Sequence, residues 1–335
     1  MALIVHSEQP RNAETVPGVL AREDLTPVDA FFVRSHGPVA DADRVWRLTL
    51  DGLVERSLSL TLDDVRGFER REVVATLQCA GNRRAELLAV RDIPGEIPWG
   101  RGAVGTARWG GVALADVLRA AGLDPRARHI ELIGDDYEVS IPLRKALASE
   151  VLLAWEMNGA PLTPDHGAPL RALVPGYIGA RSVKWLTGVR ALAEPSQGYF
   201  QAVSYRLEPG SIPLGAVALN SDILVPADGA EVPAGTLEVS GYAFAGGERS
   251  IVRVDVSRDG VEWQQAELSE SLGPWAWQRW RHRLEVDAGP LELVARAWDS
   301  AASTQPEHPS TVWNPGGYAN NAWSRVRVRV ASSSR

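Results

Sequence analysis

The chain has 335 residues, 45% of them hydrophobic and 23% charged, and this length favours two globular domains over a single hydrophobic core. Its formal net charge of −7 argues against a nucleic-acid partner, because neutralising phosphates requires a basic surface. The apolar runs are much shorter than the roughly 20 residues of a membrane-spanning helix, so we expect no membrane partner.

The first residues, MALIVHSEQPRNAE, lack the basic start and the long apolar stretch of an export signal, so we expect a cytoplasmic protein. A single cysteine, Cys79, excludes internal disulfides and zinc sites built from several cysteines. A metal bound by this thiol would have no second cysteine ligand from the same chain.

Up to about residue 205, segments typical of strands alternate with segments typical of helices. Residues 73–78 are β-branched and short, as in a strand, and residues 129–133 predict another strand. Residues 114–121 (LADVLRAA) place apolar side chains at helical spacing and stop at Gly122, which tolerates a left-handed cap. Residues 143–148 predict a further short helix. This half of the chain is therefore expected to be α+β.

The second half follows a different pattern. Residues 206–235 carry four prolines and several glycines, and predict a linker. Alternating valines at 252, 254 and 256 predict a strand, and Asp259-Gly260 predicts a hairpin turn after it. Residues 291–298 and 326–330 alternate in the same way. Six or seven short strands without a clear helix predict an antiparallel β-sandwich.

We place the domain boundary between residues 210 and 211, so the predicted domains are 1–210 and 211–335. Aromatic side chains are concentrated in the second domain, which has seven of the twelve tryptophans: Trp263, Trp275, Trp277, Trp280, Trp298, Trp313 and Trp323. Most of these are expected in its core. Because aromatics are also enriched at interfaces, we expect this domain to dock on the first domain, on a second subunit, or on both.

The motif TLQCAGNRR, residues 76–84, surrounds the only cysteine. Cys79 follows a predicted strand and precedes a turn-prone run, with Arg83 and Arg84 just beyond. Positive charge favours the thiolate, the form that ligates metals or attacks electrophiles. These residues alone leave three interpretations open: an inert buried thiol, a nucleophile served by a distant His166, and a metal ligand.

Two further blocks combine cationic and turn-forming residues. DHGAPLR at 165–171 and PGYIGARSVKWL at 175–186 form a glycine-rich passage whose cations suit phosphate, although a solvated turn would look similar. FFVRSHGPV at 31–39 places Arg34 and His36 on one side of an extended segment, behind two anchoring aromatics. The GxSxG, HExxH and GxxxxGK[ST] motifs are missing from the sequence, which excludes the hydrolases, zinc proteases and nucleotide enzymes that carry them.

Together, these blocks resemble the sulfite oxidase family of molybdopterin-dependent oxidoreductases. WAWQRW at 275–280 and NNAWSRVRVRV at 320–330 extend the resemblance to the C-terminal part. It implies an α+β molybdopterin-binding catalytic domain followed by an immunoglobulin-like antiparallel β-sandwich that forms a homodimer. The implied cofactors are molybdopterin and molybdenum.

The resemblance also implies roles for individual residues. Cys79 would ligate the molybdenum. The cofactor would be bound by Phe32, Val33, Arg34, Ser35, His36, Asp136, His166, Arg171, Arg181, Ser182, Val183 and Lys184. The substrate pocket would be formed by Arg34, Arg84, Trp99 and Tyr205.

The implied reaction is the oxidation of sulfite to sulfate by oxygen-atom transfer. No haem-binding segment is found in the sequence, so electrons are expected to pass to a separate acceptor. Relatives that oxidise sulfite carry Trp-Asn-x-Arg-Gly, whereas this chain has Gly316 in place of the arginine, within Trp313–Gly317. This difference leaves open a nitrate or sulfoxide reductase on the same scaffold. A second alternative is a non-catalytic protein that pairs a cofactor domain with an immunoglobulin-like interaction module.

Overall fold

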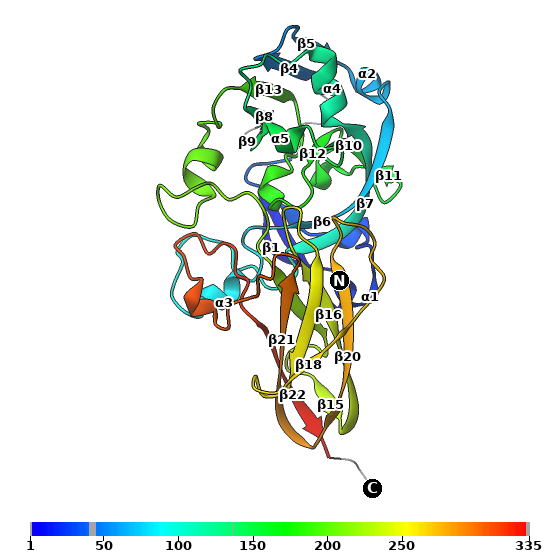
Figure 1. Ribbon diagram of the computed structural model, residues 1–335, viewed down its shortest axis with the longest axis vertical. Coiled ribbons are helices and arrows are strands. Elements are labelled where there is room, and N and C mark those ends of the chain that lie inside the picture. The colour runs from blue at the N-terminus through cyan, green and yellow to red at the C-terminus, as the bar shows by residue number, and fades with distance from the viewer. Residues whose placement is uncertain (1, 40–44, 136, 333–335) are drawn as a thin grey trace.

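The computed structural model describes residues 2–39, 45–135 and 137–332 (Figure 1). Two groups of sheets are stacked along the long axis of the molecule, and the first group belongs to the N-terminal part of the chain. The α-helices within the described residues are short: α1 (Pro17–Arg22), α2 (Leu62–Arg66), α3 (Arg84–Leu88), α4 (Leu114–Ala121) and α5 (Leu143–Ala146).

Three sheets form the N-terminal domain in the described residues. The first has the order β1-β2-β3, with β1 (Leu3–Glu8), β2 (Arg11–Thr15) and β3 (Val33–Arg34). The second has the order β11-β10-β7-β6, with β11 (Ala160–Pro161), β10 (Leu152–Met157), β7 (Val104–Ala113) and β6 (Arg70–Gln78), and β12 (Arg171–Leu173) also pairs with β10. The third has the order β5-β4-β13-β8-β9, with β5 (Leu58–Leu60), β4 (Leu48–Gly52), β13 (Gly188–Leu192), β8 (His129–Ile133) and β9 (Glu138–Pro142).

The elements predicted for this half are present. Strands β6 and β8 cover the two predicted strands, α4 has the predicted bounds, and α5 ends two residues earlier than expected. Leu114, Val117 and Leu118 of α4 are fully buried, as its apolar spacing requires. The helix ends where Gly122 adopts a φ of 72°, a conformation that glycine takes without strain.

The C-terminal domain is a β-sandwich, as predicted. One sheet has the order β14-β16-β20-β19, with β14 (Asn220–Val225), β16 (Gly235–Phe244), β20 (Gln278–Val286) and β19 (Glu267–Leu268). The other has the order β15-β22-β21-β17-β18, with β15 (Glu231–Pro233), β22 (Ser324–Ala331), β21 (Gly289–Asp299), β17 (Ile251–Ser257) and β18 (Trp263–Gln265). Both sheets contribute buried side chains to one core, Val239 and Leu284 from the first, Val256 and Leu293 from the second.

The predicted number of strands was too low, because β15 and β19 are only three and two residues long and show no alternation. Neighbouring strands in both sheets of this domain are antiparallel, except that β15 runs parallel to β22. The more specific immunoglobulin-like topology stays a prediction.

The prediction of a linker over residues 206–235 was wrong in its second part. Strand β14 begins at Asn220, and Asn220, Ser221 and Asp222 are fully buried. The prolines predicted a linker. Pro226 instead lies just after β14 and Pro233 at the end of β15, positions where a strand tolerates proline. The predicted boundary at 210/211 falls before β14, and it stays a prediction.

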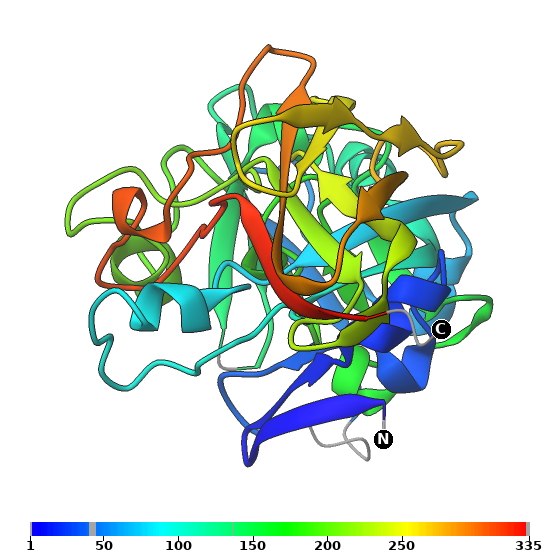
Figure 2. The ribbon, with the colours of Figure 1, turned by 90° about the horizontal axis from the view of Figure 1, so that it is seen from below.

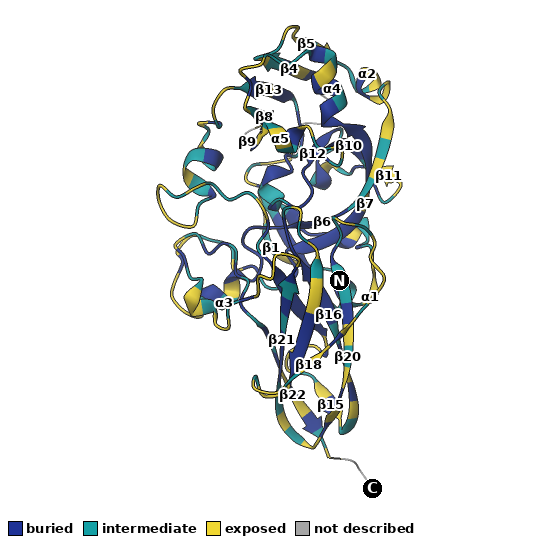
Figure 3. Ribbon diagram, in the orientation of Figure 1, coloured by how far each residue is buried: buried dark blue, intermediate teal, exposed yellow. Residues whose placement is uncertain are grey.

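The two domains pack against each other, and both have buried residues where they meet (Figure 3). Strand β6 is hydrogen-bonded directly to the second domain. The backbone nitrogen of Thr76 donates to the backbone oxygen of Trp275, and the backbone nitrogen of Trp277 donates to Thr76 Oγ1. Helix α3 and the segment before β22 lie side by side in both views (Figures 1 and 2). The expected docking of the tryptophan-rich domain on the first domain is therefore confirmed.

Among the residues that the structure describes, none of the helices combines the length and the hydrophobicity that crossing a bilayer requires.

Candidate active site

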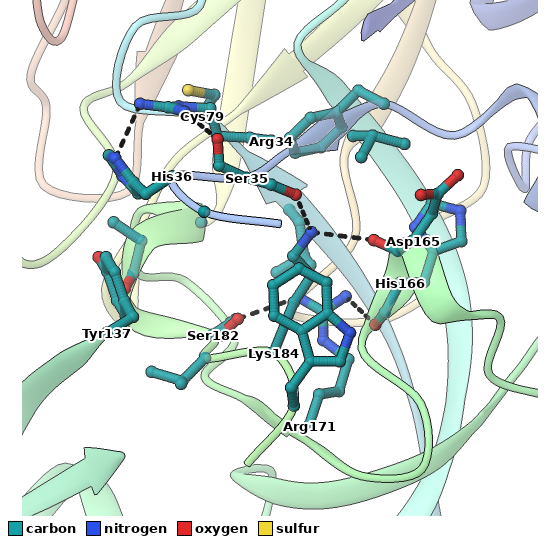
Figure 4. Close-up of a pocket in the computed structure, with 18 of the residues that line it drawn as sticks. Arg34, Ser35, His36, Cys79, Tyr137, Asp165, His166, Arg171, Ser182 and Lys184 are labelled. Atoms are coloured by element: carbon teal, nitrogen blue, oxygen red, sulfur yellow. Dashed lines mark hydrogen bonds between the residues drawn. The ribbon is translucent and has the colours of Figure 1, made fainter. Parts of the chain in front are cut away.

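A pocket brings the three sequence blocks together (Figure 4). It has an empty volume of about 930 Å³, which includes space at its open mouth, and lies between β3, the end of β6 and the loops around residues 165–171 and 179–185. Twelve of the predicted site residues line it: Phe32, Val33, Arg34, Ser35, His36, Cys79, His166, Arg171, Ser182, Val183, Lys184 and Tyr205. Asp136 lies outside the described residues, and its neighbours Asp135 and Tyr137 line the pocket.

Cys79 lies at the end of β6, where the chain turns toward α3. Its backbone nitrogen donates to the backbone oxygen of Ala103, which fixes the start of the turn. The backbone nitrogen of Gly81 approaches Sγ at 3.4 Å, a hydrogen bond to sulfur. The residue is 7% exposed and is a free thiol facing the pocket.

Arg34, Ser35 and His36 form a hydrogen-bonded wall of the pocket. Arg34 Nη1 donates to the Asn12 side-chain oxygen at 3.1 Å, and Nη2 lies 3.1 Å from Nδ1 of His36. Burial, and then the charge of Arg34, lowers the pKa of His36 to about 3, so the imidazole is neutral. Since the arginine can only donate, Nδ1 accepts and Nε2 carries the proton. Nε2 therefore donates to the hydroxyl of Tyr205, 2.8 Å away.

The adjoining wall of the pocket is cationic. Lys184 Nζ donates to Ser35 Oγ at 2.7 Å and to the backbone oxygen of Asp165 at 2.9 Å. Arg171 donates to the backbone oxygens of His166 and Ser182 at 2.9 and 3.0 Å. Burial lowers the pKa of Lys184 to about 7 and that of Arg171 to about 9. Two buried cations that bond mainly to neutral oxygens are suited to an anionic ligand.

His166 connects this wall to the short 3-10 helix Val28–Ala30, which precedes β3. Burial lowers its pKa to about 4, and the neutral ring bonds through Nε2 to the backbone oxygen of Val28 at 2.9 Å. Gly167, at a φ of 100°, lies so close to Lys184 that a Cβ atom would come within 2.9 Å of Lys184 Cβ. The glycine of the DHGAPLR block is therefore needed for this packing.

Arg181, which the sequence predicted to bind the cofactor, is not among the residues that line the pocket. It is buried, donates from Nε to the backbone oxygen of Leu214 and pairs with the side-chain oxygen of Gln201. These contacts hold the segment that carries Tyr205. The cationic motif GARSVK predicted a phosphate contact for this arginine, because sequence cannot show which way a side chain points.

Arg84 and Trp99 lie next to the pocket without lining it. Both approach Gly81, where a Cβ atom would lie 2.8 Å from Arg84 Nη2 and 3.0 Å from Trp99 Cδ1. Trp99 is 0% exposed, and its Nε1 has no hydrogen-bond partner within the described part of the chain. The arrangement leaves a buried N–H donor beside the turn that carries the thiol.

Sequence reasoning missed two residues that organise the site. Asn12 on β2 accepts from both Arg34 Nη1 and the backbone nitrogen of Ser35, although its surroundings carry no motif. Tyr318 stacks on Tyr205, with ring centroids 5.3 Å apart. Its position directly after the segment Trp313–Gly317, which departs from the expected Trp-Asn-x-Arg-Gly pattern at Gly316, was the signal that could have identified it.

The donor set determines which metal group fits. In the described residues, no three His, Cys, Asp or Glu side chains gather in a group that could hold a metal ion. One thiol facing a cationic pocket instead suits a metal that is already held by an anionic organic ligand.

Comparisons with known proteins agree with this donor set. Residues 36–200 match the oxidoreductase molybdopterin-binding domain, and residues 214–331 match the Mo-co oxidoreductase dimerisation domain. The chain is 38% identical to the sulfite oxidase of Arabidopsis thaliana, over 99% of this chain and 95% of the relative. It belongs to the sulfite oxidase family of molybdopterin-dependent oxidoreductases.

A second relative and a solved structure confirm the extent of the match. The chain is 42% identical to the mitochondrial sulfite oxidase of Mus musculus over 98% of its own length, and spans 66% of that relative. Its fold is similar to the sulfane dehydrogenase SoxCD of Paracoccus pantotrophus, with a TM-score of 0.84 and 27% identity, covering 97% of this chain and 88% of that chain. The protein is therefore a molybdopterin-dependent oxidoreductase, and its cofactor is the molybdenum cofactor.

Proposed function

We propose that this protein oxidises sulfite to sulfate and passes the electrons to a separate acceptor. The observation that carries the proposal is the meeting of one thiol, Cys79, with the cations Arg34, Arg171 and Lys184 in a single pocket. Identity of 38–42% to sulfite oxidases over nearly the whole chain supports the choice of substrate.

The pocket residues fit the cofactor by their chemistry. Cys79 would ligate the molybdenum, and Arg171 and Lys184 would bind the phosphate of the pterin, with Ser35 and Ser182 nearby. When bound, the cofactor would supply the redox chemistry, in which sulfite and water yield sulfate, two protons and two electrons. The protein's own part is to bind, orient and exchange protons.

Tyr205 is the proton-bearing group best placed toward the substrate. His36 Nε2 donates to the oxygen of Tyr205, and Tyr205 also forms a side-chain hydrogen bond with Tyr137, so its hydroxyl must exchange Tyr137 for a substrate oxygen in order to donate to it. Burial raises the pKa of Tyr205, so the phenol stays protonated near neutral pH. It would donate a hydrogen bond to an oxyanion in the pocket, with Trp99 Nε1 and Arg84 as further donors beside Cys79.

A reductase acting on nitrate or a sulfoxide is the second candidate. Gly316 favours it, because relatives that oxidise sulfite carry an arginine at this place in the pattern. Loss of one charge-assisted contact weakens anion binding by about 1.5–3 kcal/mol when nothing replaces it. The remaining donors, Arg34, Tyr205 and Trp99, are consistent with either substrate.

Two further parts of the proposal concern assembly and location. The match of residues 214–331 to a dimerisation domain supports a homodimer. The cytoplasmic location expected from the sequence stays a prediction.

Steady-state assays with artificial electron carriers test the proposed reaction. With ferricyanide as oxidant, the purified protein should convert sulfite to sulfate. With reduced viologen as donor, it should reduce nitrate and sulfoxides far more slowly. Absence of sulfite oxidation by molybdenum-loaded protein would refute the proposal, and efficient nitrate or sulfoxide reduction would establish the second candidate.

A further inference from the structure

The guanidinium group of Arg84 is paired within the protein before any substrate is present. Nη1 lies 2.8 Å from Oε2 of Glu96 and donates to the backbone oxygen of Ile97 at 3.0 Å. Nε donates to the backbone oxygen of Gly317 at 3.1 Å. The Arg84 side chain is 3% exposed and that of Glu96 is 33% exposed, so a buried cation is neutralised by a carboxylate at the rim.

The other side of this guanidinium faces the turn that carries the thiol. Nη2 of Arg84 and the indole of Trp99 approach Gly81 together, and the Gly81 nitrogen is hydrogen-bonded to Cys79 Sγ. Trp99 Nε1, the atom bonded to Cδ1, is a buried donor without a partner in the described residues. An oxyanion that reached Arg84 Nη2 and Trp99 Nε1 would give both groups an acceptor.

We propose that Glu96 is a specificity-determining residue that lowers the affinity of this site for oxyanions by neutralising Arg84. The inference rests on the proposed function, because it takes Arg84 as a substrate-binding cation. An incoming anion must share Arg84 with the Glu96 carboxylate, whose negative charge repels it. Substrates with less negative charge are penalised less, so the pair selects against multiply charged anions.

The segment after Trp313 does not replace the neutralised charge. A Cβ atom at Gly316 would lie 2.5 Å from Cε2 of Tyr318, so the tyrosine ring occupies the space into which a longer residue at 316 would extend. The same ring lies 5.1 Å from Arg84 Cζ and stacks on Tyr205. The aromatic ring of Tyr318 therefore fills the space next to Arg84 and brings no charge. The carboxylate of Glu96 is the charged group that pairs with Arg84 and neutralises it.

Sulfate binding to the molybdenum-loaded protein tests this directly, without turnover. Glu96→Gln keeps the length and the acceptor oxygen of the side chain but removes the charge. We expect the Kd for sulfate, measured by titration calorimetry, and the KM for sulfite each to fall by about fivefold, the upper end for an ion pair with one partly exposed partner, while kcat changes less than twofold. Asp92→Asn is the matched control, because it removes an exposed carboxylate from the same segment.

A second variant, Glu96→Ala, guards against a local packing defect, and melting temperature and molybdenum content verify that each variant is intact. If intact Glu96→Gln and Glu96→Ala bind sulfate as the wild type does, or if Asp92→Asn tightens binding equally, the inference is wrong. If Glu96→Gln binds sulfate more tightly but no variant oxidises sulfite, the inference stands and the proposed function fails.

Discussion

The surroundings of Lys184 change the pKa of its side chain. The motif GARSVKW predicted a cation near phosphate, but the sequence could not show that this cation is buried between Ser35 and Asp165. Burial, followed by the charge of Arg171, lowers its pKa to about 7. In cofactor-free protein near pH 7, about half of the Lys184 side chains are therefore neutral.

Anion binding to cofactor-free protein should consequently depend on pH. An anion stabilises the protonated amine, so binding takes up a proton and weakens as pH rises through 7. His36 and His166 stay neutral and Arg171 stays charged between pH 6 and 8, since their pKa values are about 3, 4 and 9. We expect the affinity for sulfate to fall by about tenfold between pH 6 and pH 8.

Calorimetric titration of sulfate at several pH values measures this effect. The Lys184→Met variant should bind more weakly at pH 6 and show little pH dependence. Wild-type affinity that stays constant from pH 6 to pH 8 would contradict the assignment of this lysine as the titrating cation.

Individual residues also mark the limits of prediction from sequence. Arg171, Lys184 and Cys79 were found because they stand in recognisable motifs, and the pocket brings them together. Asn12 was missed because its contribution is a long-range hydrogen bond to Arg34, 22 positions away, without any local pattern. Arg181 was assigned to the cofactor because motif membership does not show the direction of a side chain.

At the scale of elements, local sequence patterns identified β6, β8, β17, β21, β22 and α4 but not the long strands β7, β16 and β20. The hairpin predicted at Asp259-Gly260 is confirmed by the pairing of β17 with β18. The patterns also failed for β15 and β19, which are too short to alternate, and for β14, whose buried Asn220, Ser221 and Asp222 are polar. Asp222 is stabilised there by Arg101, 2.7 Å away in the other domain. Such a partner cannot be inferred from a window of local sequence.

The segment 312–318 provides a prediction at this scale. Gly316→Arg alone should displace the Tyr318 ring from Tyr205, lowering the melting temperature without lowering the KM for sulfite. Gly316→Arg combined with Tyr318→Ala makes room for the new side chain. In that double variant we expect the KM to fall by about tenfold or more, as for one charge-assisted hydrogen bond.

Melting curves and steady-state kinetics of the two variants, with Tyr318→Ala as the control, measure the coupling. A lower KM in Gly316→Arg alone, at an unchanged melting temperature, would show that Tyr318 does not fill this space.

In the whole molecule, the second domain supports the turn that carries the thiol. Arg83, fully buried, pairs with Glu86 at 2.8 Å and donates to the side chain of Asn220 and the backbone of Ala322. Its own backbone oxygen accepts from Asn320. The β-sandwich therefore helps to position Cys79 in addition to any role in assembly.

The proposed assembly can be measured directly. Since residues 214–331 match a dimerisation domain, we expect sedimentation equilibrium at micromolar protein to report twice the chain mass of 36.3 kDa. A mass of one chain across the accessible concentration range would contradict the homodimer.

The central claim is that Cys79 holds molybdenum at a site that oxidises sulfite. Its most direct test is molybdenum content, measured by mass spectrometry on purified wild-type and Cys79→Ser protein, together with sulfite oxidation by the same samples. We expect about one molybdenum per chain and sulfite-dependent activity in the wild type, with most of the activity lost in the variant. Wild-type protein that oxidises sulfite without molybdenum, or a Cys79→Ser variant as active as the wild type, would contradict the account.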